Sequence, residues 1–225
     1  MASRVSRREF RTMLSPGAAL LLPGVANALT ARIVADQGFA AAYVTGAGIA
    51  NTFLGVPDIG LVTVTELAEH VAAIRAAFAG PLVVDADTGF GNPLNMVRTV
   101  ELLERAAAYH DAGADVTFVE APTTMEQIAD IPRRLPWPQL ANIVLGGRTP
   151  ELPNQKLKEL GYAGVIYANV ALQAAVKGMQ AALGELRRKG HMGEATDMVA
   201  DFSERQRLVH KDDYDALERK YVTER

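Results

Sequence analysis

Six short apolar runs, each followed by a stretch with helical patterning, constrain the fold of this chain more than any other feature. The runs are apolar throughout, as expected of parallel strands that are covered on both faces. Strands that alternate with helices across short loops are typical of a parallel α/β fold, so the sequence predicts repeated βα units. The expected strands are residues 19–22, 41–44, 82–87, 116–120, 140–145 and 164–168.

Helix starts are visible between these runs. Thr63 and Glu66 have the spacing of a capping box, and Thr123 and Glu126 repeat that spacing. Towards the end of the chain, charged residues with a few apolar positions predict a C-terminal helical segment at 190–225. We expect this segment to contact another subunit.

Composition describes one ordinary domain. The 225 residues, of which 49% are hydrophobic, suffice for a single core over residues 1–225. The net charge of −3 gives no indication of a nucleic-acid partner, and no uninterrupted apolar stretch reaches membrane-spanning length. The chain has no cysteine, which excludes disulfides, thiolate metal sites and a cysteine nucleophile. These features fit a cytoplasmic protein that acts on small molecules.

Polar residues follow several of the predicted strands at the point where each strand ends. The carboxyl ends of parallel strands meet at one edge of a sheet, which is where (β/α) barrels and open α/β sheets build active sites. Because five strands share this arrangement, the sequence favours an active site there. The residues are Tyr43, Thr45, Gly46, Asp85, Asp87, Glu120, Asn142 and Asn169.

Asp85 and Asp87 carry the clearest chemical signal. If residues 82–87 form a strand, both carboxylates project from the same face. Two such groups repel each other unless a proton or a cation lies between them, and Mg²⁺ takes oxygen ligands while keeping positions for water and substrate. The alternative is that both are solvated turn aspartates that cap the next helix.

Several motifs together resemble the isocitrate lyase and phosphoenolpyruvate mutase superfamily, in particular its small bacterial lyases and mutases. The likeness covers nearly the whole chain, and the LGVPD and DADTGFG motifs are its most specific parts. The matching segments are residues 22–29 (LPGVANAL), 43–48 (YVTGAG), 54–60 (LGVPDIG), 84–93 (VDADTGFGNP), 112–115 (AGAD), 118–122 (FVEAP) and 140–143 (LANI).

The resemblance implies a TIM-barrel-like (β/α) fold and a set of site residues. Asp85 and Asp87 would hold Mg²⁺, with Mn²⁺ as a possible substitute, and the catalytic residues would be Asp58 and Glu120. The implied substrate-binding residues are Tyr43, Thr45, Gly46, Ala47 and Asn142.

From the residues alone, other interpretations of this set stay open. Asp58 after Pro57 suits a plain turn, and Glu120 suits a solvated acid at a strand end. Asn142 suits a buried amide that satisfies backbone groups.

The chain departs from this resemblance by an internal deletion. The family fold has eight βα units, whereas we count six here, with two units missing after Ala106. By the resemblance, the missing part includes a catalytic Lys-Arg-Cys-Gly-His loop, which agrees with the absence of cysteine. Six strands must close a smaller barrel, leave an open sheet or pair with another chain.

The implied function is Mg²⁺-dependent C–C cleavage of a 2-hydroxy di- or tricarboxylate of the methylisocitrate or dimethylmalate type, which gives a 2-oxo acid. The alternatives are a non-catalytic metal- or carboxylate-binding remnant, a 2-oxo acid decarboxylase and a phosphonate mutase-type enzyme. The resemblance also implies a homo-oligomer, specifically a tetramer.

Overall fold

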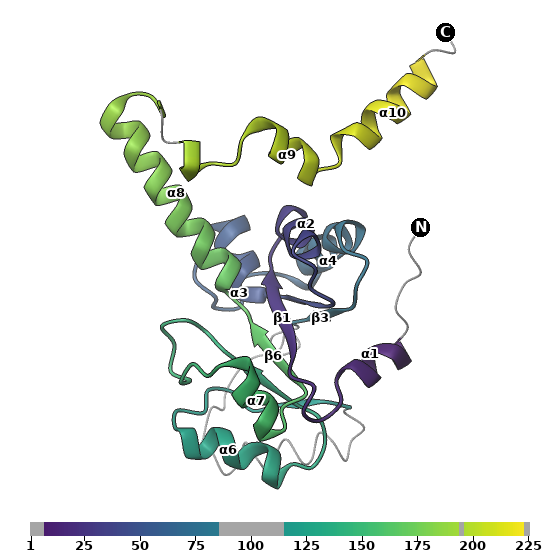
Figure 1. The fold of residues 1–225 in the computed structure, drawn as a ribbon, viewed down its shortest axis with the longest axis vertical. Helices are drawn as coiled ribbons and strands as arrows, with labels where there is room; N and C mark the ends of the chain where they lie inside the picture. Colours follow the sequence, from purple (N-terminus) through teal and green to yellow (C-terminus); the bar gives the residue numbers. More distant parts are fainter. Residues whose placement is uncertain (1–6, 86–114, 194–195, 223–225) are drawn as a thin grey trace.

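Six parallel strands form one sheet in the order β3-β2-β1-β6-β5-β4 (Figure 1). The protein is represented by a computed structural model that describes residues 7–85, 115–193 and 196–222. The first and last strands, β1 and β6, pair along four residues from Leu20↔Gly164 to Pro23↔Tyr167. The strands are β1 Leu20–Val25, β2 Ala42–Val44, β3 Leu82–Val84, β4 Thr117–Phe118, β5 Gln139–Asn142 and β6 Gly164–Tyr167.

Helices follow the strands as the sequence predicts. The α-helices are α1 Arg7–Met13, α2 Ala28–Asp36, α3 Gly46–Ile49, α4 Val64–Ala77, α6 Met125–Arg134, α7 Asn154–Leu160, α8 Val170–Lys189, α9 Phe202–Leu208 and α10 Lys211–Val222. A π-helix, η1 Ala50–Leu54, extends α3, and a short 3₁₀ helix, η2 Thr196–Met198, follows α8. Within the described part of the chain, no helix combines the length and apolar character that crossing a membrane requires.

All six predicted strands are confirmed, although several are shorter than predicted. The capping box at the start of α4 is also confirmed, because the Thr63 hydroxyl accepts from the Glu66 amide and the Glu66 carboxylate accepts from the Thr63 amide. The second box is displaced by one residue. Thr124 is the N-cap of α6 and its partner is Gln127, so the predicted pairing of Thr123 with Glu126 is wrong.

The two faces of the sheet bury different clusters. The outward-facing side chains of the strands form two clusters on the outer face of the sheet. One cluster packs under α2 and α4, and the other packs under α6 and α7. The opposite face buries Leu22, Leu140 and Ile166, with Tyr43 and Val83 packed against them. Since side chains alternate along a strand, residues in step with Tyr43, Val83 and Leu140 project from this inner face.

The described sheet is open between β3 and β4, which are its two ends in the strand order. Of the three outcomes considered for a six-stranded chain, the described residues show the open sheet rather than a smaller closed barrel. The predicted deletion point after Ala106 lies in residues 86–114, outside the described residues.

The C-terminal helices stand apart from the sheet. Figure 1 shows α8 leaving the end of β6 and running away from the strands, and the chain then returns through α9 above α2. Arg207 on α9 forms a two-pronged ion pair with Asp36 at the end of α2, with N–O distances of 2.6 and 2.9 Å. In the described part of the segment predicted at residues 190–225, the chain forms η2, α9 and α10.

Candidate active site at the carboxyl ends of the strands

Tyr43 and Asp85 occupy neighbouring positions on the inner face of the sheet. Tyr43 on β2 pairs in register with Val83 on β3, and the Asp85 amide donates to the Val44 carbonyl at 3.0 Å just beyond β3. Asp85 is two residues after Val83, so alternation along the chain gives it the same inward direction. The short strands β2 and β3 thus hold a phenol and a carboxylate side by side at their carboxyl ends.

The electrostatic environment of Tyr43 brings four of the predicted residues together. Burial is the main cause that raises the pKa of Tyr43 above its usual range, and a hydrogen bond to Asp85 and the charge of that carboxylate add to it. The charges of Glu120 and Asp58 raise the pKa of Tyr43 further. The phenol therefore remains protonated and can donate, while the acids around it supply oxygen atoms.

Glu120 follows β4 on the same face, two residues after Phe118. The Glu120 side chain reaches solvent at the concave end of the sheet. Part of it is nevertheless buried, and this partial burial raises the pKa of Glu120. The charge of Asp85 raises that pKa further, because the carboxylates are close enough to repel each other. Glu120 is thus a carboxylate that holds a proton more readily than an ordinary surface glutamate.

The segment after β2 contributes a tight turn rather than a free hydroxyl. Thr45 is only 2% exposed, and its hydroxyl accepts from the Gly48 amide at 3.1 Å as the N-cap of α3. The same hydroxyl donates to Asn169 Oδ1 at 3.4 Å, which connects β2 to the chain after β6. Thr45 therefore shapes the site, and its hydroxyl is already used within the protein.

Gly46 and Ala47 form the first turn of α3, beside Asp85. The Gly46 amide donates to Asp85 Oδ2 at 3.4 Å, and a Cβ at Gly46 would come within 3.3 Å of the same oxygen. A glycine here lets the backbone approach the carboxylate closely. Ala47 is half-buried next to it, so the two residues supply backbone rather than side-chain groups.

Asn142, at the end of β5, has a buried Oδ1 without a hydrogen-bond partner. It is two residues after the inward-facing Leu140, so it belongs to the inner face. Buried polar atoms are nearly always paired, and one that is not requires an explanation. Asn142 Oδ1 is therefore an acceptor on the inner face that the described residues leave unpaired.

Asp58 lies in the exposed segment that follows η1. Its charge reaches Tyr43, which places it near the site, whereas its side chain is open to solvent. The π-helix η1 ends at Gly55, whose φ of 68° is the left-handed conformation that glycine adopts without strain. Single π-helical turns are frequent next to functional sites, and this one sets the direction of the segment that carries Asp58.

The residues that the structure describes fit a hard cation in donor type. Asp85, Glu120 and the Asn142 amide offer oxygen atoms, which are the ligands that Mg²⁺ prefers. Asp87, the second predicted metal ligand, lies outside the described residues. Over residues 7–85, 115–193 and 196–222, no group of three acidic or histidine side chains is gathered closely enough to bind a metal ion.

Gln173 on the first turns of α8 was missed by sequence reasoning. Its Nε2 donates to the Leu145 carbonyl at 2.9 Å, which fixes the loop after β5, and its buried Oε1 has no partner. No sequence pattern indicates this role, because Gln173 is an ordinary polar residue within a helix until the loop is placed against it.

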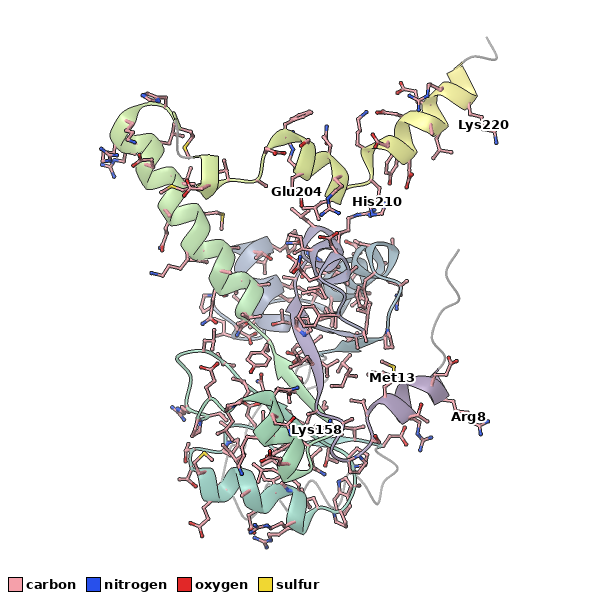
Figure 2. All side chains as sticks on the ribbon, viewed as in Figure 1. Arg8, Met13, Lys158, Glu204, His210 and Lys220 are labelled. Atoms are coloured by element: carbon pink, nitrogen blue, oxygen red, sulfur yellow. The ribbon has the colours of Figure 1, made fainter. Side chains whose placement is uncertain are left out.

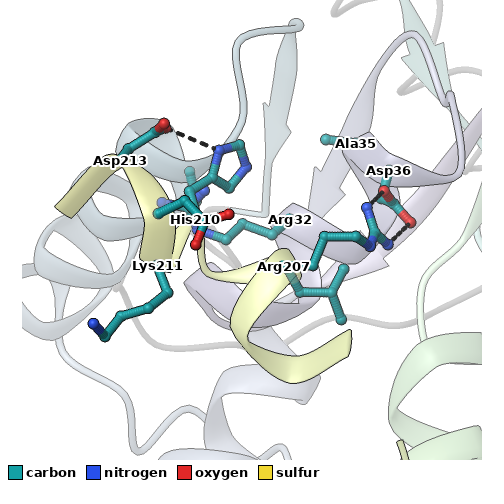
Figure 3. Close-up of a pocket in the computed structure, with 10 residues that line it drawn as sticks. Arg32, Ala35, Asp36, Arg207, His210, Lys211 and Asp213 are labelled. Carbon is teal, nitrogen blue, oxygen red and sulfur yellow. Dashed lines mark hydrogen bonds and ion pairs between the residues drawn. The ribbon is translucent and has the colours of Figure 1, made fainter. Parts of the chain in front are cut away.

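A hollow of about 460 Å³ lies elsewhere, between the ends of α2 and α4 and the junction of α9 with α10 (Figure 3). None of the strand-end residues lines it. Its walls carry mutually paired charges, including Arg207 with Asp36 and His210 with Asp213 at 3.5 Å. We therefore assign this hollow to the packing of the C-terminal segment and the candidate site to the strand ends.

Comparison with known proteins gives consistent results over most of the chain. The family model for phosphoenolpyruvate phosphomutase matches residues 10–106 and 98–187. A 2,3-dimethylmalate lyase of Eubacterium barkeri is 30% identical over 284 residues, which cover 96% of this chain and 98% of the relative. A 2-methylisocitrate lyase of Aeropyrum pernix is 29% identical over 261 residues, which cover 87% and 84% of the two chains.

Solved structures show the same fold. A crystal structure of 2,3-dimethylmalate lyase superposes with a TM-score of 0.85 at 25% identity and covers 97% of this chain and 96% of that chain. An oxaloacetate acetylhydrolase in complex with the product oxalate gives a TM-score of 0.85 at 22% identity, with coverage of 97% and 98%. The fold is therefore TIM-barrel-like, shortened here to six strands.

The same comparisons confirm the internal deletion. The alignment with the dimethylmalate lyase is 284 residues long, although this chain has 225, and it covers both proteins almost end to end. The relative therefore has internal residues that this chain lacks. The family model matches in two parts that overlap at residues 98–106, which is where the sequence predicts that two βα units are missing.

Proposed function

Because the chain belongs to the phosphoenolpyruvate phosphomutase family and resembles carbon–carbon lyases within it, we propose that it cleaves a C–C bond in a 2-hydroxy di- or tricarboxylate. The products are a 2-oxo acid and a second carboxylate. Substrates of the methylisocitrate or dimethylmalate type fit this proposal, because the relatives named 2-methylisocitrate lyase and 2,3-dimethylmalate lyase are similar over most of their length.

One observation supports the proposal more than any other. The charges of Asp85, Glu120 and Asp58 raise the pKa of Tyr43, and the charge of Asp85 raises the pKa of Glu120, so residues of four separate segments meet at the carboxyl ends of the strands. Perturbed acids that gather in a concave end of an α/β sheet are typical of an active site. The unpaired Oδ1 of Asn142 on the same face indicates that this arrangement is completed by a ligand.

The residues can be given roles in such a reaction. Glu120 takes the proton of the substrate 2-hydroxyl, for which its raised pKa suits it at neutral pH. The C2–C3 bond then breaks, C2 becomes the carbonyl carbon of the 2-oxo acid, and the bonding electron pair passes to the departing carbon. The departing carbon must gain one proton, and Glu120 gives it the proton that it took from the 2-hydroxyl. Asn142 orients a substrate carboxylate through its amide.

A divalent ion such as Mg²⁺, with Mn²⁺ as a substitute, would be held by Asp85 and by Asp87. It would stabilise the negative charge that develops on the 2-oxygen. The phenol of Tyr43 donates to Asp85 and so orients that carboxylate. Gly46 leaves room for this arrangement by allowing the backbone close to Asp85.

A second candidate function is favoured by a specific observation. The chain has no cysteine, and the family's cysteine-bearing loop falls within the predicted deletion. A chain that retains the carboxylate-binding half of the site without the proton-transfer half would bind a metal and a 2-oxo acid and release them unchanged. A regulatory carboxylate-binding protein is therefore the alternative to the lyase.

The first experiment measures thermal stability with Mg²⁺ and either pyruvate or oxalate. We expect the two ligands together to raise the Tm by several degrees in the native chain, because a ligand that binds only the folded state stabilises it. Asp85→Asn should abolish that shift, whereas the control Asp130→Asn, whose side chain is 47% exposed on α6, should retain it. The absence of any shift in the folded native chain would overturn both candidate functions.

Turnover separates the two candidates. A lyase should release a 2-oxo acid from 2-methylisocitrate or 2,3-dimethylmalate in the presence of Mg²⁺, and Glu120→Gln should lower kcat by about 100-fold or more while the thermal shift with oxalate remains. A chain that shows the thermal shift but releases no 2-oxo acid from either substrate is the carboxylate-binding protein.

A further inference from the structure

Ala121, the residue directly after Glu120, has a left-handed backbone conformation. Its φ is 51°, and in the described part of the chain only two other non-glycine residues, Ala19 and His210, have a positive φ. This conformation is unfavourable for a residue with a Cβ, because the Cβ comes too close to the following carbonyl oxygen. The ring of Pro122 also favours an extended conformation in the residue before it. Ala121 thus holds a conformation that neither its own side chain nor the next residue prefers.

The chain before Ala121 is fixed by a buried polar network. The Thr117 hydroxyl donates to Gln139 Oε1 at 2.9 Å and accepts from Trp137 Nε1 at 2.8 Å. Gln139 is fully buried and Thr117 is 6% exposed, so water does not compete for these hydrogen bonds. The Thr117 amide donates to the Pro138 carbonyl at 3.1 Å. The two-residue strand β4 is therefore held to β5 by side chains as well as by its backbone.

The chain after Ala121 is fixed by the start of α6. Gln127 Oε1 accepts from the amides of Thr123 and Thr124 at 2.7 and 3.2 Å. The Thr124 hydroxyl in turn accepts from the Gln127 amide at 3.1 Å. Pro122, between Ala121 and this cap, has a φ that its ring restricts. The stretch that joins β4 to α6 is therefore held at both ends.

A strained φ persists where the surrounding structure fixes the chain on both sides, and such residues gather at active sites. Here the strained residue is the neighbour of Glu120, the acid at the concave end of the sheet. If Ala121 relaxed to an extended backbone, the chain could not run from β4 into the cap at Thr124 without moving Glu120. The conformation of Ala121 and the place of the Glu120 carboxylate are therefore determined together.

We propose that Ala121 is a positioning residue, whose left-handed backbone, held between the Thr117 network and the cap of α6, places the Glu120 carboxylate for proton transfer. This role rests on the proposed lyase function, in which Glu120 takes the proton of the 2-hydroxyl and returns it to the departing carbon. Ala121 acts through its backbone, and its methyl group has no part in the reaction.

The test compares Ala121→Gly with Ala121→Val in the full chain. Glycine adopts a positive φ without strain, so Ala121→Gly should keep kcat within about two-fold of the native value and should be at least as heat-stable. A β-branched residue is a genuine outlier at positive φ, so Ala121→Val should lower the Tm and displace Glu120. We expect its kcat to fall about 100-fold, as in Glu120→Gln, while KM changes little.

A double variant separates positioning from a merely structural role. If Ala121 acts through Glu120, Ala121→Val should lower kcat no further in the Glu120→Gln background, although it should lower the Tm in both backgrounds. The upstream network has its own matched pair. Thr117→Val removes the hydroxyl and should lower kcat as Ala121→Val does, whereas Thr117→Ser keeps the hydroxyl and should retain kcat.

The outcomes distinguish this role from the lyase function itself. In an active native chain, the positioning role is overturned if Ala121→Val retains kcat, if Ala121→Gly loses it, or if Ala121→Val lowers kcat by the same factor with and without Glu120. A native chain without turnover overturns the lyase function instead, and the role of Ala121 in it. Thermal denaturation then tests the backbone alone, and a Tm of Ala121→Val above that of Ala121→Gly would overturn the strained turn.

Discussion

At the scale of single residues, the site is defined by two groups, Tyr43 and Glu120, whose pKa values are raised by burial and by neighbouring acids. Asp85 raises the pKa of both Tyr43 and Glu120, and Glu120 contributes to the raised pKa of Tyr43. These effects follow from placing like charges and a buried phenol at the ends of adjacent strands. This arrangement lowers the free energy of unfolding of the ligand-free protein. Such a loss is common where binding residues are gathered in one site.

Glu120→Gln should therefore stabilise the ligand-free protein at neutral pH. The pKa of Glu120 is raised above its ordinary value of 4.5. The folded protein therefore has the full stability of protonated Glu120 below pH 4.5, and it loses this stability as the pH rises through the raised pKa. Glutamine carries no such charge, and we expect a Tm gain of roughly 1–3 °C at pH 8 and none at pH 4. Thermal denaturation at both pH values measures it.

The control for this substitution is Glu69→Gln, at an exposed position on α4. It removes the same charge outside the concave end of the sheet and should change the Tm little at either pH. A loss of stability in Glu120→Gln at pH 8 would contradict the environment that we describe for Glu120.

At the scale of elements, helix starts position the loops that carry the site. Thr45 caps α3 and holds the turn beside Asp85, while Thr124 and Gln127 form the capping box of α6 just after Glu120. Gln127 also accepts from the Thr123 amide at 2.7 Å, so one amide side chain satisfies the backbone of both threonines. This second acceptance explains why the box forms one residue later than the sequence predicts.

Gln127→Ala should cost about 0.5–1 kcal/mol of unfolding free energy, because two backbone amides lose their acceptor. Glu126→Ala, the residue that the sequence singled out, should cost less than that. Urea denaturation of the two variants measures the difference. An equal or larger loss in Glu126→Ala would mean that the original pairing of Thr123 with Glu126 is the one that forms.

At the scale of the whole molecule, an ion pair joins the C-terminal segment to the body. Arg207 bonds Asp36 on α2 and also Glu204 on its own helix, and the pairing lowers the pKa of Asp36. Figure 2 shows Glu204 and His210 on this segment, above the helices that flank β1. Many apolar residues of the C-terminal segment are exposed, such as Phe202 at 68%, and so contribute little to packing against the body. The ion pair between Arg207 and Asp36 is therefore a main link between the segment and the body.

Arg207→Gln should release the segment from α2 without unfolding the sheet. Amide hydrogen exchange in residues 202–222 should accelerate several-fold, because local opening requires little more than breaking this link. In the native chain the link depends on ionised Asp36, so it is present above the ordinary carboxylate pKa of 3.8 and is lost as pH falls through the lowered pKa. High salt should weaken it in the same way.

The matched control is Arg205→Gln on the same helix. Its guanidinium lies 5.0 Å from the centre of the Phe202 ring and does not bridge to α2 in the described structure. Unchanged exchange in Arg207→Gln, or equal acceleration in both variants, would show that the ion pair does not hold the segment.

Much of this protein follows from its sequence alone. The six strands, the capping box of α4 and the family could all be predicted, because periodicity, cap residues and motifs are local properties of the chain. The inward direction of Tyr43, Asp85 and Glu120 also follows from alternation along each strand. The deletion after Ala106 was visible because it removes whole βα units and leaves the pattern on either side intact.

The tertiary structure decided the rest, because these features depend on residues far apart in the chain. The Thr45 hydroxyl is engaged by Gly48 and by Asn169, 124 residues away, which no local pattern indicates. The sheet remains open between β3 and β4 in the described residues, although the sequence allowed a closed barrel, and α8 buries none of its residues. Sequence thus determined which elements form and which side chains face inward, while packing decided which polar groups are already paired and which surfaces remain free.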